Sequence, residues 1–198
     1  EAHFDIIDTS NPELKKLNDK LKKVDITFKR QSSQKGLGDA ILCAKNLINE
    51  DKFAIMLGDD FYIDYSKPAL KQLIDKLDLN DGIISSEIRN KEDMVSKGMI
   101  IEKDGLVIDL VEKPKIDQVT SKYAISGRYI VPRKIFEYLE SITPSERGEI
   151  ELTDALLKCV NSGSKINHAV IDGKRLDVGT PEEYLRANIE YAKSNKLI

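Results

Sequence analysis

Apolar residues recur along this chain with two kinds of spacing, one typical of helices and one typical of strands. From Phe53 the chain reads "FAIMLGDD", an apolar run that ends in acids, as in a buried parallel strand whose tip leaves the sheet. On both sides of this run, apolar positions repeat every three or four residues, which is the spacing of an amphipathic helix. Residues 1–90 therefore predict alternating helices and strands, with right-handed crossovers between parallel strands.

The same periods, together with capping and turn residues, predict the other elements. The expected helices cover residues 11–23, 37–48, 68–77, 132–142 and 150–160, with a last helix that begins at the capping sequence Thr180-Pro181-Glu182-Glu183. The expected strands cover residues 24–30, 53–60, 82–88 and 123–131, with hairpins at Asp104-Gly105 and at Asp172-Gly173. On the last helix, the residues expected to face the core are Leu185, Ile189 and Ala192.

These elements predict an α/β fold with a Rossmann-like mixed, mainly parallel sheet flanked by helices. The length of 198 residues suits a single domain. Within it, residues 1–90 form the alternating part and residues 91–198 a second part that is richer in β structure.

Composition excludes several classes of protein. The chain has 31 basic and 34 acidic residues, so no basic field indicates a nucleic-acid partner. No apolar run approaches the length of a membrane span, so no membrane partner is expected.

The cysteines Cys43 and Cys159 are far apart in the sequence, which favours a reduced, cytoplasmic protein. Neither has the nearby Cys or His partners that a zinc site needs. His3 and His168 are isolated, which argues against a Ser/His or Cys/His nucleophile.

Two acids follow predicted strands, where ligands of open α/β sheets bind. Asp59 ends the run "FAIMLGDD", and Asp177 lies in "RLDVGT" just before a helix begins. As a pair they would supply the carboxylates that Mg²⁺ takes from proteins, while substrate phosphates and water complete its shell. The alternative is that each acid only caps the turn that follows its strand.

Two further stretches are candidates for binding. Glu112-Lys113-Pro114 offers a carboxylate for sugar hydroxyls and an ammonium for phosphate, although an exposed charged strand end would look the same. In "QSSQKGLGDAIL", Gln31 has the donor and acceptor to read a base edge, and Gly36 would let a flat ring approach the backbone. A tight turn is the alternative here, because the stretch matches neither the Walker A loop nor GxGxxG.

Taken in order, the motifs resemble the sugar-phosphate nucleotidyltransferases, and among them the bacterial and archaeal UTP–glucose-1-phosphate uridylyltransferase (UDP-glucose pyrophosphorylase) family. The matching stretches are "EAHFD", "RQSSQKGLGDAILCAK", "FAIMLGDD", "GMIIEKDG", "VEKPK", "YAISGRYIV", "GEIELTDAL" and "LDVGTPEEYLRAN". The resemblance implies a fold of the nucleotide-diphospho-sugar transferase type, with the nucleotide bound by residues 1–90 and the sugar phosphate by residues 91–198.

The resemblance also implies a role for each matching residue. On the nucleotide side, Gln31 would contact the uracil edge, Gly36 would lie against the base, and Asp59 and Asp177 would hold Mg²⁺. The residues it implies on the sugar-phosphate side are Gly98 under the hexose, Glu112 on its hydroxyls, Lys113 on the phosphate and Gly127 in the same pocket.

The implied reaction joins UTP and glucose 1-phosphate into UDP-glucose, with Mg²⁺ as cofactor and pyrophosphate as the leaving group. Asp39 and Gly58 stand where the family often has His and Pro, so a thymidylyltransferase or another sugar nucleotidyltransferase is an alternative. A second alternative is a non-catalytic regulatory domain that binds nucleotide sugars. The retention of Asp59, Glu112, Lys113 and Asp177 favours an enzyme.

The family's opening strand and its glycine-rich phosphate loop have no counterpart in these residues. From the resemblance we expect the chain to lack that N-terminal piece and to be inactive by itself. We also expect an unpaired edge of the central sheet, and with it self-association or a homo-oligomer.

Overall fold

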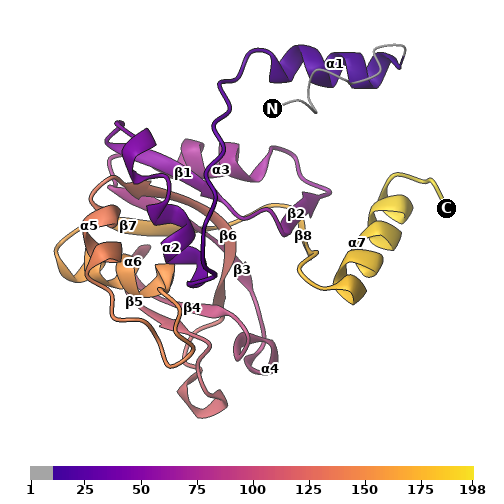
Figure 1. Cartoon of the computed structure of the whole chain (residues 1–198). Helices are drawn as coiled ribbons and strands as arrows, with labels where there is room; N and C mark the ends of the chain where they lie inside the picture. Colours follow the sequence, from indigo (N-terminus) through magenta and orange to yellow (C-terminus); the bar gives the residue numbers. More distant parts are fainter. Residues whose placement is uncertain (1–10) are drawn as a thin grey trace. The chain divides into compact units, whose positions relative to one another are not determined.

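The computed structural model describes residues 11–198 (Figure 1). The chain divides into two compact units, residues 1–32 and residues 33–198. The stretch "EAHFD", with His3, lies outside the described residues.

The first unit contains helix α1, Pro12–Leu21. Its start is the one predicted, because the side-chain oxygen of Asn11 accepts a hydrogen bond of 2.9 Å from the backbone N–H of Glu13. Residues 24–30 were predicted as a strand, and this prediction is wrong, since they form neither strand nor helix. An extended segment becomes a strand by pairing with another, and the described residues of this unit contain no second strand.

The second unit is built on a six-stranded sheet in the order β1-β6-β3-β7-β5-β4. Its strands are β1 Lys52–Met56, β3 Gly82–Ile88, β4 Gly98–Lys103, β5 Leu106–Glu112, β6 Tyr123–Pro132 and β7 Ile166–Val170. The hairpin predicted at Asp104-Gly105 is confirmed by the antiparallel pairing of β4 with β5.

The α/β class is confirmed, but the sheet is not mainly parallel. Only β3 and β7 pair in parallel among the strands of the described residues. Strand β6 lies between β1 and β3 and runs antiparallel to both. The strands β1 and β3 therefore share a direction, as predicted, but they are not neighbours.

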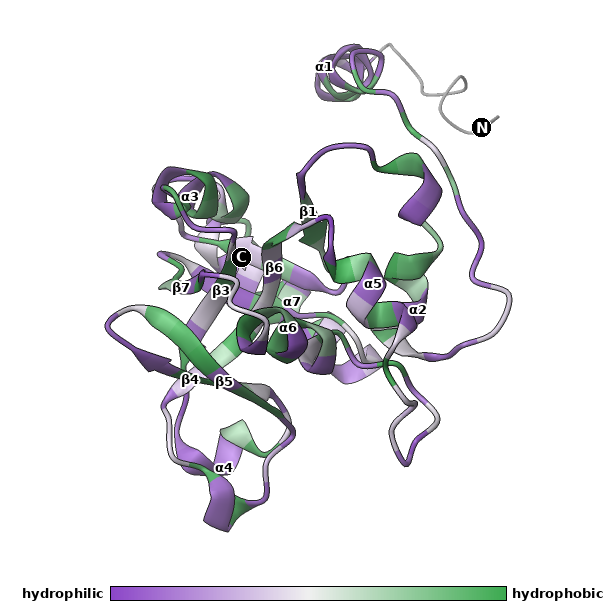
Figure 2. Ribbon diagram, turned by 90° about the vertical axis from the view of Figure 1, so that its left-hand side faces the viewer, coloured by the Kyte–Doolittle hydropathy of each residue, from purple (hydrophilic) through white to green (hydrophobic). Residues whose placement is uncertain are grey.

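Helices cover both faces of this sheet (Figures 1 and 2). Helix α3 lies on one face, and α2, α5 and α6 lie on the other. The helices of the second unit are α2 Gly36–Leu42, η2 Lys45–Leu47, α3 Ala69–Lys76, α4 Lys91–Met94, η3 Ile116–Gln118, α5 Ile135–Glu140, α6 Leu152–Asn161 and α7 Pro181–Ser194. Successive sheet residues point to opposite faces, so Ile84 joins the core under α5 and α6, whereas Ile83 packs with Leu73 of α3. Figure 2 shows α2, α5 and α6 with apolar and polar positions interleaved, as in helices that pack by one face.

Both cysteines carry free thiols. Cys159 belongs to α6 and lies in the core, and its burial raises the pKa of the thiol to about 12. A thiol with that pKa is inert, since the thiolate is the reactive form. In the described part of the chain, no helix combines the length and the apolar character needed to cross a membrane.

A second, two-stranded sheet pairs β2, Asp60–Ile63, with β8, Lys174–Asp177. The hairpin predicted at Asp172-Gly173 is therefore wrong, because the two segments it would join belong to different sheets. Gly173, with φ +133°, turns the chain from β7 to β8. The antiparallel register places Asp60 opposite Asp177.

Helix α7 begins where the capping residues predicted. The Thr180 hydroxyl oxygen accepts a hydrogen bond of 3.2 Å from the backbone N–H of Glu183. The predicted inner face is wrong, because Leu185 is 61% exposed and Ile189 40% exposed, whereas Ala187 is buried. Ala187 packs against β2 and β8. The helix therefore buries the face that carries Ala187, and the face that carries Leu185 and Ile189 stays exposed.

Candidate active site

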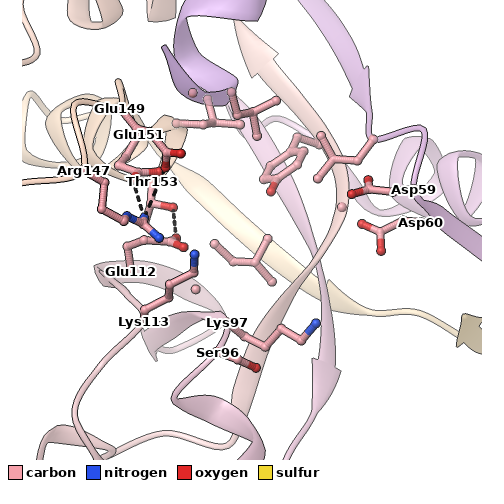
Figure 3. A pocket seen from close by; sticks show the side chains of 18 of the residues that line it. Asp59, Asp60, Ser96, Lys97, Glu112, Lys113, Arg147, Glu149, Glu151 and Thr153 are labelled. Atoms are coloured by element: carbon pink, nitrogen blue, oxygen red, sulfur yellow. Dashed lines mark hydrogen bonds and ion pairs between the residues drawn. The ribbon is translucent and has the colours of Figure 1, made fainter. Parts of the chain in front are cut away.

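A cavity of about 350 Å³ opens at the strand ends of the second unit. Its wall includes six of the residues singled out from the sequence: Gly36, Asp59, Gly98, Glu112, Lys113 and Gly127. Figure 3 shows Asp59 and Asp60 on one side of the cavity and Glu112 and Lys113 on the other. Gln31 belongs to residues 1–32, so its contact with a base stays a prediction.

The acids Asp59 and Asp177 come together beside Gly179. A side chain at position 179 would place its Cβ 3.2 Å from Asp177 Oδ1 and 3.5 Å from Asp59 Oδ2, so both carboxylates reach one point. The backbone joins them as well, because the N–H of Val178 donates to the carbonyl of Asp59 over 2.9 Å. The fold thus brings together two acids that are far apart in the sequence.

Arg175 organises this acidic end of the cavity. Its guanidinium pairs with Asp60, with Glu87 at 3.1 Å and with Asp177 at 3.1 Å, and only 9% of its side chain is exposed. Lys97 adds a contact of 3.2 Å to the same oxygen of Asp177. Burial would raise the pKa of Asp177, but hydrogen bonds from Gly179 and Lys97 and the charge of Arg175 bring the pKa below its ordinary value.

Asp60 has the opposite balance. Its burial raises the pKa of the carboxyl above the ordinary value, although Arg175 acts against this shift. Asp59, its neighbour in sequence, has no ion pair within residues 11–198. Both acids line the cavity, but they differ in their partners, because Asp60 is held by Arg175 and Asp59 is not.

Asp60, Lys97 and Arg175 are site residues that no motif of the sequence predicted. One signal for Arg175 was available, because it lies two residues before Asp177 on β8 and two-residue spacing puts side chains on one face of a strand. Lys97 carried no local signal, since its contact with Asp177 depends on how β4 and β8 are placed.

The donor set beside Gly179 suits a divalent cation. Among residues 11–198, Asp59 has no ion pair, and Asp177 Oδ1 accepts one hydrogen bond, from the N–H of Gly179 at 3.1 Å. The described residues contain no group of three or more His, Cys, Asp or Glu side chains with the geometry of a metal site. Two carboxylates without a complete protein cage are what Mg²⁺ uses when substrate phosphates supply other ligands.

The opposite end of the cavity is lined by the carboxylate of Glu112, the ammonium of Lys113 and the backbone of Gly98. Gly98 pairs with Glu112 across the β4–β5 ladder, and a Cβ at position 98 would lie 2.8 Å from Ile125 Cδ1. Lys113 has φ +46°, which is uncommon for a residue with a side chain, and it has no ion pair in the described part of the chain. Its ammonium is therefore available to an anion.

Gly127 lines the cavity as predicted, but its surroundings give it a structural role too. Its φ is +77°, and a Cβ there would lie 1.6 Å from Asp60 Oδ2. Arg128 closes the same corner, because its Nη1 donates to the carbonyls of Leu57 at 2.8 Å and Gly127 at 3.0 Å. Only glycine fits between this backbone and Asp60.

The glycine pair of "KGLGDAIL" packs closely against another backbone. The N–H of Gly38 donates to the carbonyl of Ile150, and the N–H of Ile150 donates to the carbonyl of Lys35, both over 2.8 Å. A Cβ at Gly36 would lie 2.8 Å from the Cβ of Glu149. The glycines are therefore needed for packing, and a contact between Gly36 and a base stays a prediction.

The fold and this cavity place the chain in the class of mixed α/β nucleotidyltransferases. Residues 5–194 match the family described as Nucleotidyl transferase, and the chain belongs to that family. It is 35% identical to the UTP–glucose-1-phosphate uridylyltransferase of Bacillus subtilis, over 99% of this chain and 72% of that protein. It is 36% identical to the protein of the same name in Mycoplasma pneumoniae, over 83% of this chain and 59% of that protein.

A solved structure supports the same fold. A UDP-glucose pyrophosphorylase in complex with UDP-glucose superimposes with a TM-score of 0.83 and 33% identity, over 91% of this chain and 71% of that one. The chain thus spans between 59% and 72% of the lengths of these three proteins.

Proposed function

We propose that the intact protein is a UTP–glucose-1-phosphate uridylyltransferase, which forms UDP-glucose and releases pyrophosphate. One observation carries the proposal. One cavity has Asp59 at one end and Glu112 with Lys113 at the other, in a chain that resembles uridylyltransferases over nearly its full length.

The side chains at the second end suit a sugar phosphate. Lys113 offers an ammonium for the phosphate of glucose 1-phosphate, and Glu112 accepts hydrogen bonds from sugar hydroxyls. Gly98 leaves the cavity floor without a side chain where the ring would lie. The attacking phosphate is already an anion at neutral pH, so these residues act mainly by aligning it with the α-phosphorus of UTP.

Asp59 and Asp177 would hold Mg²⁺, and Arg175 with Lys97 orients the Asp177 carboxylate. The ion, when bound, neutralises phosphate oxygens and so lowers the repulsion between the two anionic substrates. Lys113 offsets charge at the other end of the cavity. This division of roles needs no general base.

The test is pyrophosphate release by the intact protein with MgCl₂, glucose 1-phosphate and a panel of UTP, dTTP, CTP and ATP. We expect kcat/KM to be at least about 10-fold higher for UTP than for dTTP, since dTTP carries an extra methyl group on the base and lacks the ribose 2′-hydroxyl, and the methyl group alone costs roughly that much in a fitted pocket. A higher value for dTTP would indicate the thymidylyltransferase. Calorimetric binding of UDP-glucose without turnover of any pair would indicate a regulatory domain and contradict the proposal.

A further inference from the structure

Thr153, the second residue of α6, reaches across to the strand end that carries Glu112. Its hydroxyl Oγ1 donates a hydrogen bond of 2.8 Å to Glu112 Oε2. The Thr153 residue is 6% exposed, and its helix neighbours Leu152 and Leu156 lie in the core. The hydroxyl is therefore fixed in space by packing rather than by its contact with Glu112.

The bond engages one oxygen of the carboxylate. Within residues 11–198, Glu112 Oε1 has no hydrogen-bond partner, and the side chain lines the cavity. Oε2 lies on the strand side, 3.2 Å from where a Cβ would stand at Gly98. Anchoring one oxygen leaves the other in a set direction for a ligand.

Glu112 has few other means of keeping that direction. It ends β5, and the backbone leaves the ladder at Lys113, whose φ is +46°. On the same side of the cavity lie the acids Glu149 and Glu151, which are paired with Arg147 at 3.5 Å and 2.6 Å (Figure 3). Without an anchor, the Glu112 side chain would sample other rotamers beside these charges.

We propose that Thr153 is a positioning residue that sets the selectivity of the cavity for sugar hydroxyls. It holds Glu112 so that Oε1 faces the sugar, and it touches no substrate itself. This inference rests on the proposed function, in which Glu112 accepts a hydroxyl of the hexose.

The test compares Thr153→Val, which keeps the shape and loses the hydroxyl, with Thr153→Ser, which keeps the hydroxyl. We expect Thr153→Val to raise KM for glucose 1-phosphate about 10-fold, because a buried hydrogen bond to a charged group is lost. KM for UTP should change less than about 2-fold, and Thr153→Ser should recover most of the affinity. Thr120→Val, at an exposed loop position, is the matched control.

Deoxy sugars separate positioning from a general structural effect. In the wild type, 2-deoxy- or 3-deoxyglucose 1-phosphate should bind more weakly than glucose 1-phosphate, and this preference should disappear in both Glu112→Ala, which removes the acceptor, and Thr153→Val. An unchanged preference in Thr153→Val, an equal rise in KM for UTP, or an equal loss in Thr153→Ser would overturn the inference.

The same comparison works by calorimetry with glucose 1-phosphate and UDP-glucose. If the wild type binds these ligands without turnover, the proposed function fails while the role of Thr153 is still measured as a change in Kd. A wild type that binds neither ligand would overturn both proposals.

Discussion

Replacing Asp59 by Asn lowers kcat of the intact protein with UTP and glucose 1-phosphate by roughly 100-fold or more. The change keeps the size of the side chain and removes one of the two carboxylates that would hold the divalent cation, so charge on the phosphates is no longer offset. Because Asp59 has no ion pair in the described residues, the free energy of unfolding should change by less than about 1 kcal/mol. Pyrophosphate release, Mn²⁺ binding by calorimetry and urea unfolding measure the three quantities.

The neighbouring acid provides the contrast. Asp60→Asn should cost about 3 kcal/mol of stability, since it leaves the buried guanidinium of Arg175 short of a partner. Asp117→Asn, at an exposed position in η3, should change neither activity nor stability. Full activity of Asp59→Asn would contradict the metal assignment, and equal losses of stability in Asp59→Asn and Asp60→Asn would contradict the different roles given to the two acids.

Gly127→Ala should destabilise the protein by about 3–5 kcal/mol. The new Cβ would lie 1.6 Å from Asp60 Oδ2, and Asp60 is held by Arg175 and cannot withdraw without breaking that pair. The left-handed φ of +77° adds backbone strain.

Gly105→Ala is the matched control for this substitution. Gly105 has nearly the same φ, +81°, but a Cβ there meets nothing within 4 Å. It should therefore show only the backbone cost, about 1 kcal/mol. Chemical denaturation of both variants isolates the effect of the contact with Asp60. Similar losses in the free energy of unfolding would show that this contact does not contribute to the cost of Gly127→Ala.

Local pattern was enough to find most helices and the strands of the second unit. The hairpin at Asp104-Gly105 and the cap at Thr180 depend on neighbouring residues only, and both are confirmed. The motifs "FAIMLGDD" and "VEKPK" placed acids and a lysine at strand ends, and the fold gathers Asp59, Glu112 and Lys113 around one cavity.

Predictions failed where a choice between distant partners was needed. Period-two spacing shows which side chains share a face of a strand, but it does not show which strands are neighbours. The placement of β6 between β1 and β3 was therefore not predicted. The same reason explains why β8 pairs with β2 instead of β7, and why Ala187 of α7 is covered instead of Leu185.

Local sequence patterns therefore specify the class of fold, most helices and strands of the second unit, and the identity of the acids and the lysine at the strand ends. The tertiary structure alone decided which strands pair, how Arg175 and Lys97 hold Asp177, and how Thr153 anchors Glu112. These contacts join residues far apart in the chain. Their geometry comes from long-range hydrogen bonds and packing, which no local period of the sequence encodes.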